Sequence, residues 1–222
     1  HIMRAGDLIS DEIPTLDGSD NALFAMQLLD EYKMKQLPVV DRGEFLGLIS
    51  EDAVLDVDDP EKPLRGYGTR LQPIYVKHDQ HAYDIVRAAA EFKLSAVPIL
   101  GPDNKYMGVV SIYCLIRELS YMAAVNETGG ILVLELDQSD YSLTEIAQIV
   151  EGNDARILSA NVTSRPDSKK MEVTLKINRT HMDGIIQTFN RYDYIISASF
   201  HESAMDEMMK NRYDELMRYL NL

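Results

Sequence analysis

The first half of the chain contains a sequence that recurs after about 60 residues, and this duplication restricts the fold more than any other feature. Four blocks of the first copy return in the second copy in the same order: 13–16 and 73–76, 19–22 and 79–82, 37–40 and 97–100, and 45–50 and 106–111. Two copies of one sequence pattern predict two copies of one structural unit, folded alike.

Each copy has the same predicted order of elements. A short β-prone stretch leads to an amphipathic helix, for which Ser19 and Asp79 are the predicted N-caps. Two strands follow, the first containing a proline and the second ending in Gly-x-hydrophobic-Ser, at Ser50 and Ser111. A final helix begins directly after each serine. Residues 56–70 are charged and rich in turn-forming residues, which is typical of a connector.

The second half follows a different pattern, β-α-β-β-α-β, from residue 131 to residue 200. Its first helix begins with a capping box, Ser142 to Glu145, and the whole order is that of a ferredoxin-like sandwich. A last helix is predicted from Met205. Its apolar positions are spaced by three or four residues: Met205, Met209, Tyr213, Leu216 and Leu220. Such a seam packs on its own domain or on a second subunit, and both remain open.

Charge restricts the partners. The 222 residues include 22 Lys and Arg and 36 Asp and Glu, so the net charge is −14. A surface of this sign repels phosphate backbones and anionic lipids, so we expect neither a nucleic-acid nor a membrane partner, although a locally basic pocket could hold a small anion. The lone cysteine, Cys114, fits a reducing compartment, and uninterrupted apolar runs reach only five residues. These features predict a cytoplasmic protein.

These motifs support a family resemblance. The duplicated plan resembles a pair of cystathionine-β-synthase (CBS) domains over residues 3 to about 125. The β-α-β-β-α-β segment resembles an ACT domain, and the order of the two is similar to acetoin-utilization-type proteins of bacteria. The expected fold class is α/β (α+β), a CBS pair plus a ferredoxin-like ACT-type domain with a C-terminal helix. The expected parts are CBS repeats at 3–62 and 63–127, an ACT-like domain at 128–201 and a helix at 202–222.

The resemblance implies ligand sensing, because CBS pairs bind adenine nucleotides in clefts between their repeats. A flat base needs apolar walls, and a phosphate needs hydroxyl and amide donors at a helix start. Four residues in each copy correspond to these needs: Thr15, Leu37, Pro38 and Ser50, and Tyr75, Val97, Pro98 and Ser111. We therefore expect a small ligand such as AMP, ADP, ATP or S-adenosylmethionine, and no required cofactor.

The chain departs from the family pattern at the ribose position, where the family's side chain accepts hydrogen bonds from the ribose of the ligand. The family has an aspartate three residues after the Ser of Gly-x-hydrophobic-Ser, whereas this chain has Ala53 and Cys114. The serines and prolines are equally explained as helix caps and strand starters without a ligand. In the ACT-like segment, Tyr141 stands where the family has the glycine that admits a ligand carboxylate.

No catalytic motif accompanies these features. His78 and His81 lack a third metal ligand, and Cys114 lies in an apolar run typical of an inert core thiol. The acidic residues 56–59 lack the spacing of a calcium loop and read as a solvated linker. The sequence thus predicts a non-catalytic, homodimeric sensor that relays ligand binding through the ACT-like domain. Two alternatives are a homodimeric scaffold without ligand and an amino-acid sensor that uses the ACT-like domain.

Overall fold

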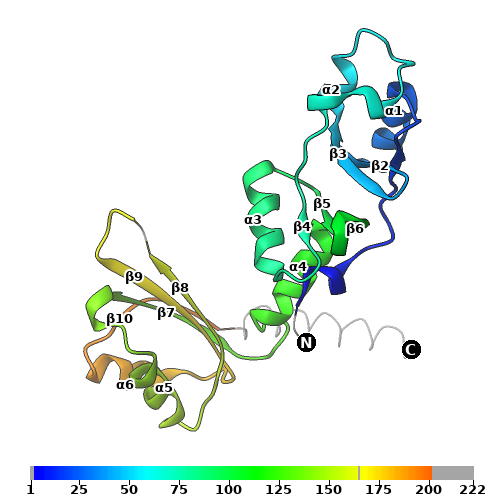
Figure 1. Cartoon of the computed structure of the whole chain (residues 1–222). Coiled ribbons are helices and arrows are strands. Elements are labelled where there is room, and N and C mark those ends of the chain that lie inside the picture. The colour runs from blue at the N-terminus through cyan, green and yellow to red at the C-terminus, as the bar shows by residue number, and fades with distance from the viewer. Residues whose placement is uncertain (1–2, 165, 202–222) are drawn as a thin grey trace, which may run out of the picture. The chain divides into compact units, whose positions relative to one another are not determined.

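The computed structural model describes residues 3–164 and 166–201, which divide into two compact units with a boundary between Leu119 and Ser120 (Figure 1). The first unit contains both copies of the repeat, and the second contains the β-α-β-β-α-β segment. The predicted C-terminal helix at 202–222 and its apolar seam lie outside the described residues.

Both copies of the repeat fold as predicted, into strand, helix, two strands and helix. The first copy consists of β1 (Leu16–Asp17), α1 (Ala22–Glu31), β2 (Gln36–Asp41), β3 (Glu44–Ser50) and α2 (Glu51–Leu55). The second consists of β4 (Val76–Lys77), α3 (Ala82–Phe92), β5 (Ala96–Leu100), β6 (Tyr106–Ser111) and α4 (Ile112–Met122). Because β2 and β5 are apolar on consecutive residues, both faces of these central strands are buried.

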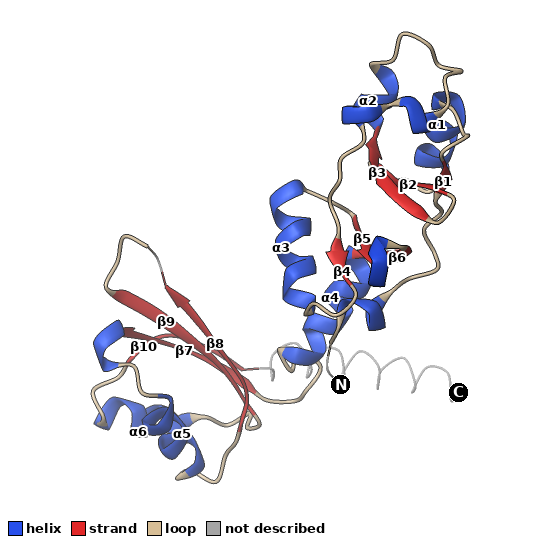
Figure 2. Ribbon diagram, in the orientation of Figure 1, coloured by secondary structure: helices blue, strands red, loops and turns tan. Residues whose placement is uncertain are grey.

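Each copy forms a three-stranded sheet with its central strand parallel to one neighbour and antiparallel to the other (Figure 2). The orders are β1-β2-β3 and β4-β5-β6. The apolar stripe of the first helix in each copy packs on the sheet and closes a core, with Ala22, Ala25 and Leu29 in one copy and Ala82, Ile85 and Ala89 in the other.

The two copies exchange their leading segments. Ser10, which precedes β1, pairs with Val109 in β6, and Gln72, which precedes β4, pairs with Leu48 in β3. The backbone N–H of Ser10 donates to the Val109 carbonyl at 2.8 Å, and the N–H groups of Leu48 and Gln72 each donate to the other residue's carbonyl. The leading segment of each copy therefore adds a β-bridge to the last strand of the other copy's sheet.

This exchange explains the glycine of the Gly-x-hydrophobic-Ser motif. Gly47 and Gly108 have φ values of +142° and +144°, next to the register shifts between β2 and β3 and between β5 and β6. A Cβ on Gly108 would lie 2.5 Å from Ile9 Cγ2, and one on Gly47 would lie 2.8 Å from Leu71 Cβ. The backbone conformation and the crossing segment both favour a residue without a side chain.

The predicted helix caps are wrong by two residues. The N-caps are Asn21 and His81, whose side chains accept from the N–H groups of Phe24 and Tyr83, rather than Ser19 and Asp79. A turn closed by a side-chain hydrogen bond precedes each helix. The Asp17 N–H donates to Asp20 Oδ2 in the first copy, and the Lys77 N–H donates to Gln80 Oε1 in the second. Each turn holds Ser19 or Asp79 outside the helix, and Ser19 donates instead to Asp17.

The second unit has the predicted ferredoxin-like order. It consists of β7 (Gly130–Asp137), α5 (Leu143–Glu151), β8 (Ile157–Ser164), β9 (Lys170–Ile177), α6 (Asp183–Arg191) and β10 (Ile195–His201). The antiparallel sheet has the order β10-β7-β9-β8, and both helices cover the same face (Figure 2). The predicted capping box forms, because the Glu145 N–H donates to Ser142 Oγ at 3.2 Å.

Candidate functional site

In each copy the sheet brings the four predicted ligand-site residues to one end. Gln36 pairs with Ser50 and Leu37 with Ile49, so the start of the proline strand lies beside the end of β3. The parallel pairing of Leu16 with Val39 continues this register and brings Thr15 level with Pro38. The second copy repeats the arrangement with Tyr75, Val97, Pro98 and Ser111.

The two serines cap the helices that follow them. The Ala53 N–H donates to Ser50 Oγ at 3.1 Å, and the Cys114 N–H donates to Ser111 Oγ at the same distance. A hydroxyl that accepts one hydrogen bond keeps its own hydrogen to donate. Each serine can therefore cap its helix and still donate to a ligand oxygen.

The predicted ligand-site residues differ from one another in solvent exposure. Leu37 and Val97 are core side chains with 0% and 1% of their surface exposed, and both prolines are buried as well. Thr15 is exposed, Tyr75 is 41% exposed, and both serines are half-buried. In this structure a ligand could touch the side chains of Thr15, Tyr75 and the serines, whereas the apolar residues face the cores.

The two copies also differ in charge at the helix start. The five-residue helix α2 carries Glu51 and Asp52 in its first turn, whereas the eleven-residue helix α4 has no acidic residue there. The N-terminal end of a helix attracts anions, and two carboxylates at that end oppose the attraction. A phosphate is therefore favoured at Ser111 over Ser50.

Aromatic rings gather beside the second copy's leading strand. The ring of Phe45 meets that of Tyr75 edge-on at 6.4 Å between centroids, and it stacks on Tyr106 at 6.1 Å. Burial raises the pKa of Tyr106 well above its usual range, so this hydroxyl stays neutral. The first copy has Thr15 where the second has Tyr75, and no sequence motif predicted this cluster beyond the aromatic residues themselves.

The ribose position is occupied by apolar packing in both copies. Ala53 packs against the core of the first copy, and the Cys114 thiol is buried and approaches the Leu8 carbonyl at 3.5 Å. The interpretation of Cys114 as a core thiol is confirmed, and the contact with Leu8 fixes the exchanged N-terminal segment on α4.

In the second unit, a cavity of about 360 Å³ lies where β7 leads into α5. Its carboxylates are Glu135, Asp137, Asp140, Glu145 and Asp193. Lys170 also lines it, at 3.3 Å from Asp137. A small carboxylate would meet repulsion here, and the neighbouring Tyr141 is half-buried against the core. Both observations disfavour the amino-acid sensor.

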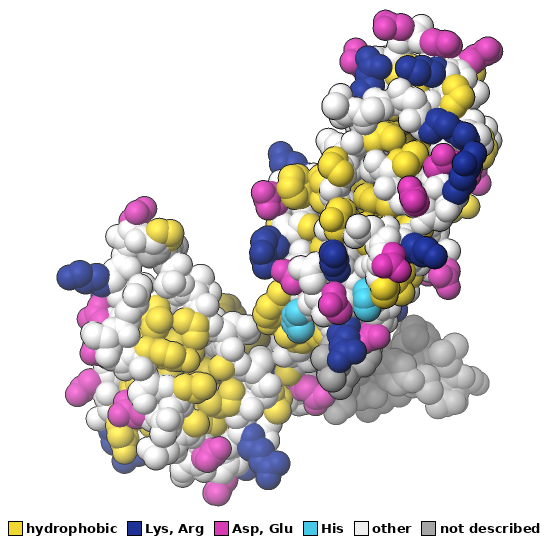
Figure 3. Space-filling view, viewed as in Figure 1, with side chains coloured by type: hydrophobic (Ala, Val, Ile, Leu, Met, Phe, Trp, Pro, Cys, Tyr) yellow, Lys and Arg dark blue, Asp and Glu magenta, His cyan; other side chains and the backbone are white. Residues whose placement is uncertain are grey.

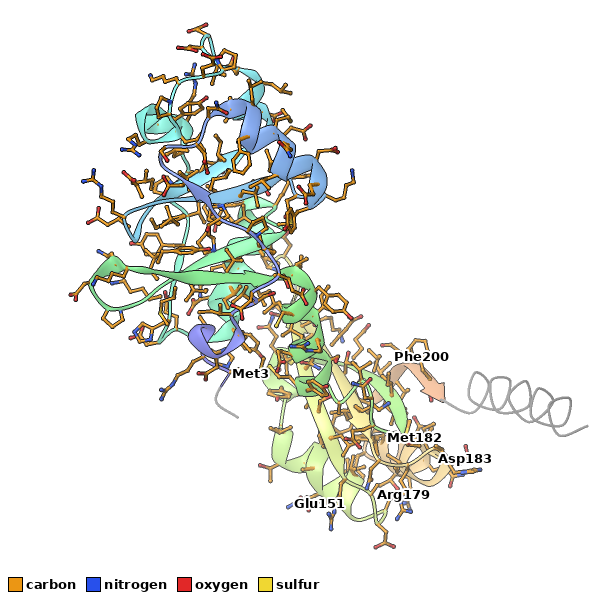
Figure 4. All side chains as sticks on the ribbon, turned by 90° about the vertical axis from the view of Figure 1, so that its right-hand side faces the viewer. Met3, Glu151, Arg179, Met182, Asp183 and Phe200 are labelled. Atoms are coloured by element: carbon orange, nitrogen blue, oxygen red, sulfur yellow. The ribbon has the colours of Figure 1, made fainter. Side chains whose placement is uncertain are left out.

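Another hollow of about 640 Å³ in this unit is lined by two acidic and two basic side chains. Glu151 and Arg179, labelled in Figure 4, are joined there by Asp154 and Arg156. The Arg179 Nε–H donates to the Asp154 carbonyl at 3.1 Å. The balance of charges gives this hollow no preference for an anion or a cation.

Three further observations concern surface charge, metal ligands and membrane-spanning helices. On the face shown in Figure 3, Lys and Arg side chains are scattered among Asp and Glu and form no single basic patch. Within the described part of the chain, no three His, Cys, Asp or Glu residues are arranged to hold a metal ion. Likewise, none of the described helices is both long enough and apolar enough to cross a bilayer.

Comparison with known proteins identifies the first unit. The CBS domain model matches residues 5–59 and 67–121. Inosine-5'-monophosphate dehydrogenase of Methanocaldococcus jannaschii is 20% identical over 134 residues, which are 60% of this chain but only 27% of that protein.

The solved structures that resemble the chain include the following two. A CBS domain pair/ACT domain protein from Thermotoga maritima is 18% identical with a TM-score of 0.48, over 53% of this chain and 96% of that one. CBSX2, a CBS-pair protein from Arabidopsis thaliana, was solved with AMP and is 22% identical with a TM-score of 0.45, over 52% of this chain and 95% of that one. By the match to the CBS domain model, residues 5–59 and 67–121 of this chain are a tandem pair of CBS domains.

Proposed function

We propose that the protein is a non-catalytic regulatory sensor whose CBS pair binds an adenine nucleotide or a related adenosyl compound. One observation carries the proposal. At the start of α4, Ser111 combines a helix N-terminus free of acidic side chains with a hydroxyl that can still donate, and Tyr75 on the same sheet end offers an exposed ring.

The second copy is the better binding site of the two. At the first copy, a phosphate on Ser50 would lie beside Glu51 and Asp52 and would find a helix of one and a half turns. At the second copy, the base can stack on Tyr75, which has no aromatic counterpart at Thr15. Because the ribose position is Cys114, the phosphate and the base supply most of the binding energy.

The test replaces each serine with a residue that keeps the cap but repels a phosphate. Aspartate is a good N-cap, so Ser111→Asp preserves α4 while it places a negative charge where the phosphate would bind. Isothermal titration of the full chain with AMP, ATP and S-adenosylmethionine should show AMP and ATP affinity at least about tenfold weaker in Ser111→Asp, which is about 1.4 kcal/mol. The matched control Ser50→Asp should bind like the unmodified chain.

Each outcome decides a different point. Loss of binding in Ser50→Asp but not in Ser111→Asp would move the site to the first copy. No heat from the unmodified chain with any of these ligands would refute the sensor and leave the homodimeric scaffold. Equal melting temperatures of both variants would show that lost binding does not reflect lost folding.

We assign the second unit the role of an ACT-like module that relays the bound state, within a cytoplasmic homodimer. The ferredoxin-like order of β7 to β10 supports the ACT-like assignment, and the lone buried Cys114 fits a reducing compartment. A ligand can drive such a relay only if it binds two arrangements of the protein with different affinity.

A further inference from the structure

We propose that one side of the four-stranded sheet in the second unit, called here the open face, is the docking surface of the chain's own C-terminal segment, residues 202–222. The open face is the side opposite α5 and α6, and it carries Ile131, Val133, Thr174, Lys176, Ala198 and Phe200. The inference concerns the second unit alone and does not depend on any ligand.

The helices cover only the other side of this sheet. Both α5 and α6 lie over the side that carries the core residues Leu132 and Leu134 (Figure 2). Side chains alternate along a strand, so Ile131, which precedes Leu132, lies on the opposite side. The pairing register places Ile131 between Phe200 of β10 and Lys176 of β9, and these three form one row of the open face.

The sequence of β7 is typical of a strand that is covered on both sides. Residues 131–134 are Ile, Leu, Val and Leu, with no alternation of apolar and polar side chains. The side chains of Ile131 and Val133 are nevertheless only half-buried, and Phe200 beside them is 59% exposed (Figure 4). An apolar sheet face of this kind is stabilised by a second layer that packs on it.

The open face contains a hollow of about 340 Å³ at the end of β10. The apolar side chains that line it are Ala123, Val125, Ile131 and Phe200. Ala123, which precedes β7, is held at the rim because the Ser159 hydroxyl donates to its carbonyl at 2.9 Å. The hollow therefore offers apolar walls next to the point where β10 ends, at His201.

The C-terminal segment has the length and the pattern to cover this face. Residues 202–222 lie outside the described residues and follow directly after β10. Their sequence predicts a helix with one apolar seam, from Met205 to Leu220. A helix over 205–222 would be about 27 Å long, and the eight-residue strand β7 is about 26 Å long. The segment is thus long enough to return across the whole open face.

The charges of the segment complement those of the open face in the same direction. Lys176 lies in the row of Phe200, near the end of β10, whereas Glu135 and Glu172 pair with each other farther along the same face. Residues 202–207 contain three carboxylates and no basic side chain. Residues 208–222 contain two carboxylates and all three basic side chains of the segment: Lys210, Arg212 and Arg218. A segment that turns back after β10 would bring its acidic start to Lys176 and its basic residues toward the two glutamates.

The test measures how fast a thiol on the open face reacts with iodoacetamide in the full chain. Thr174→Cys places a cysteine at the centre of this face, and Gln187→Cys places one on the exposed side of α6. The first should react at least about tenfold more slowly than the second, because it reacts only when the segment opens. Ala198→Cys is a second probe of the open face. The unmodified chain gives the background rate of the buried Cys114.

One pair of substitutions in the seam and one pair opposite it isolate the cause. Met209→Gln with Leu216→Gln removes apolar side chains from the seam and should raise the labelling rate of Thr174→Cys at least about tenfold, because the segment then leaves the face more often. Asn211→Gln with Arg218→Gln changes the opposite side of the same predicted helix and should leave the rate unchanged. Thermal melts establish that the sheet is folded in each variant.

Three results would each overturn this inference. They are open-face probes that react as fast as Gln187→Cys, a labelling rate that the seam substitutions leave unchanged, and protection that is lost on dilution. The last result would make a second copy the occupant of the open face. None of them involves Ser111 or Tyr75, so the nucleotide titrations decide the proposed function separately.

Discussion

Tyr194 shows how one side chain in the second unit joins a strand to a helix. Its hydroxyl donates to Glu145 Oε1 at 2.7 Å, and its ring meets Phe189 edge-on at 5.3 Å between centroids. Burial, and then the hydrogen bond and charge of Glu145, raise the pKa of this hydroxyl well above its usual value. The neutral tyrosine is therefore the form that the folded protein favours.

We expect Tyr194→Phe to lower the free energy of unfolding by about 1 kcal/mol at pH 7, because Glu145 loses its donor. The raised pKa stabilises the fold fully below pH ~10, the unfolded value, and this contribution is lost as the pH rises from there toward the folded value. The stability difference between the two proteins should therefore shrink above pH ~10. Urea unfolding at several pH values measures it, and a difference that grows with pH would contradict the assignment.

Tyr192→Phe is the matched control for that experiment. Tyr192 lies two residues earlier and is 58% exposed, and it also borders the acidic cavity. Its hydroxyl is not the donor to Glu145, so its removal should leave the unfolding free energy unchanged at every pH.

The exchanged leading segments depend on the glycines over which they cross. We expect Gly108→Ala to destabilise the protein by roughly 1–3 kcal/mol more than Gly43→Ala, because its Cβ would overpack against Ile9. Gly43, in the turn between β2 and β3, also has a positive φ, but open space surrounds its Cβ position. Guanidinium unfolding of both variants measures this difference, to which the backbone at Gly108, with φ at +144° against +84° at Gly43, contributes together with the packing. Equal losses would show that the crossing segment yields to the added methyl group.

Local pattern was sufficient to predict most elements. The repeat located β2, β3, β5 and β6, and the Ser142 capping box located the start of α5, because periodicity and capping depend on neighbouring residues. The sequence pattern did not predict the caps at Asn21 and His81. The turns before these helices are closed by side-chain hydrogen bonds, and the helical periodicity carries no information about them.

The exchange of leading segments could not be predicted, because it pairs Ser10 with Val109 across about a hundred residues without a sequence signature. The same limit applies to the candidate site. The sequence located Ser50 and Ser111 at strand-to-helix junctions, but it did not show that Leu37 and Val97 are core side chains. It also grouped Ile112, Tyr113 and Ile116 with Cys114 in one apolar run, whereas the helix turns the first three outward and the thiol inward.

For the molecule as a whole, nucleotide binding and the proposed homodimer bear on each other. Ser111 caps the first turn of α4, and Cys114 on the same helix contacts the exchanged N-terminal segment at Leu8, so a bound phosphate would act on a helix that also holds this segment. If each nucleotide binds the dimer and the monomer with different affinity, then dimerisation and nucleotide binding must be coupled. Reciprocity requires the coupling factor per bound nucleotide to be the same in both directions.

We therefore expect saturating AMP to change the dimer dissociation constant by a factor of roughly 5 to 150 per nucleotide. The chain diluted below the dimer dissociation constant, where it is a monomer, should bind AMP with an affinity that differs from that of the dimer by the same factor. Sedimentation velocity with and without AMP gives the first number, and AMP titrations below and above that dissociation constant give the second. Unequal factors would contradict the coupling, and a dimer indifferent to AMP would mean that the sensor acts through another element, such as the second unit.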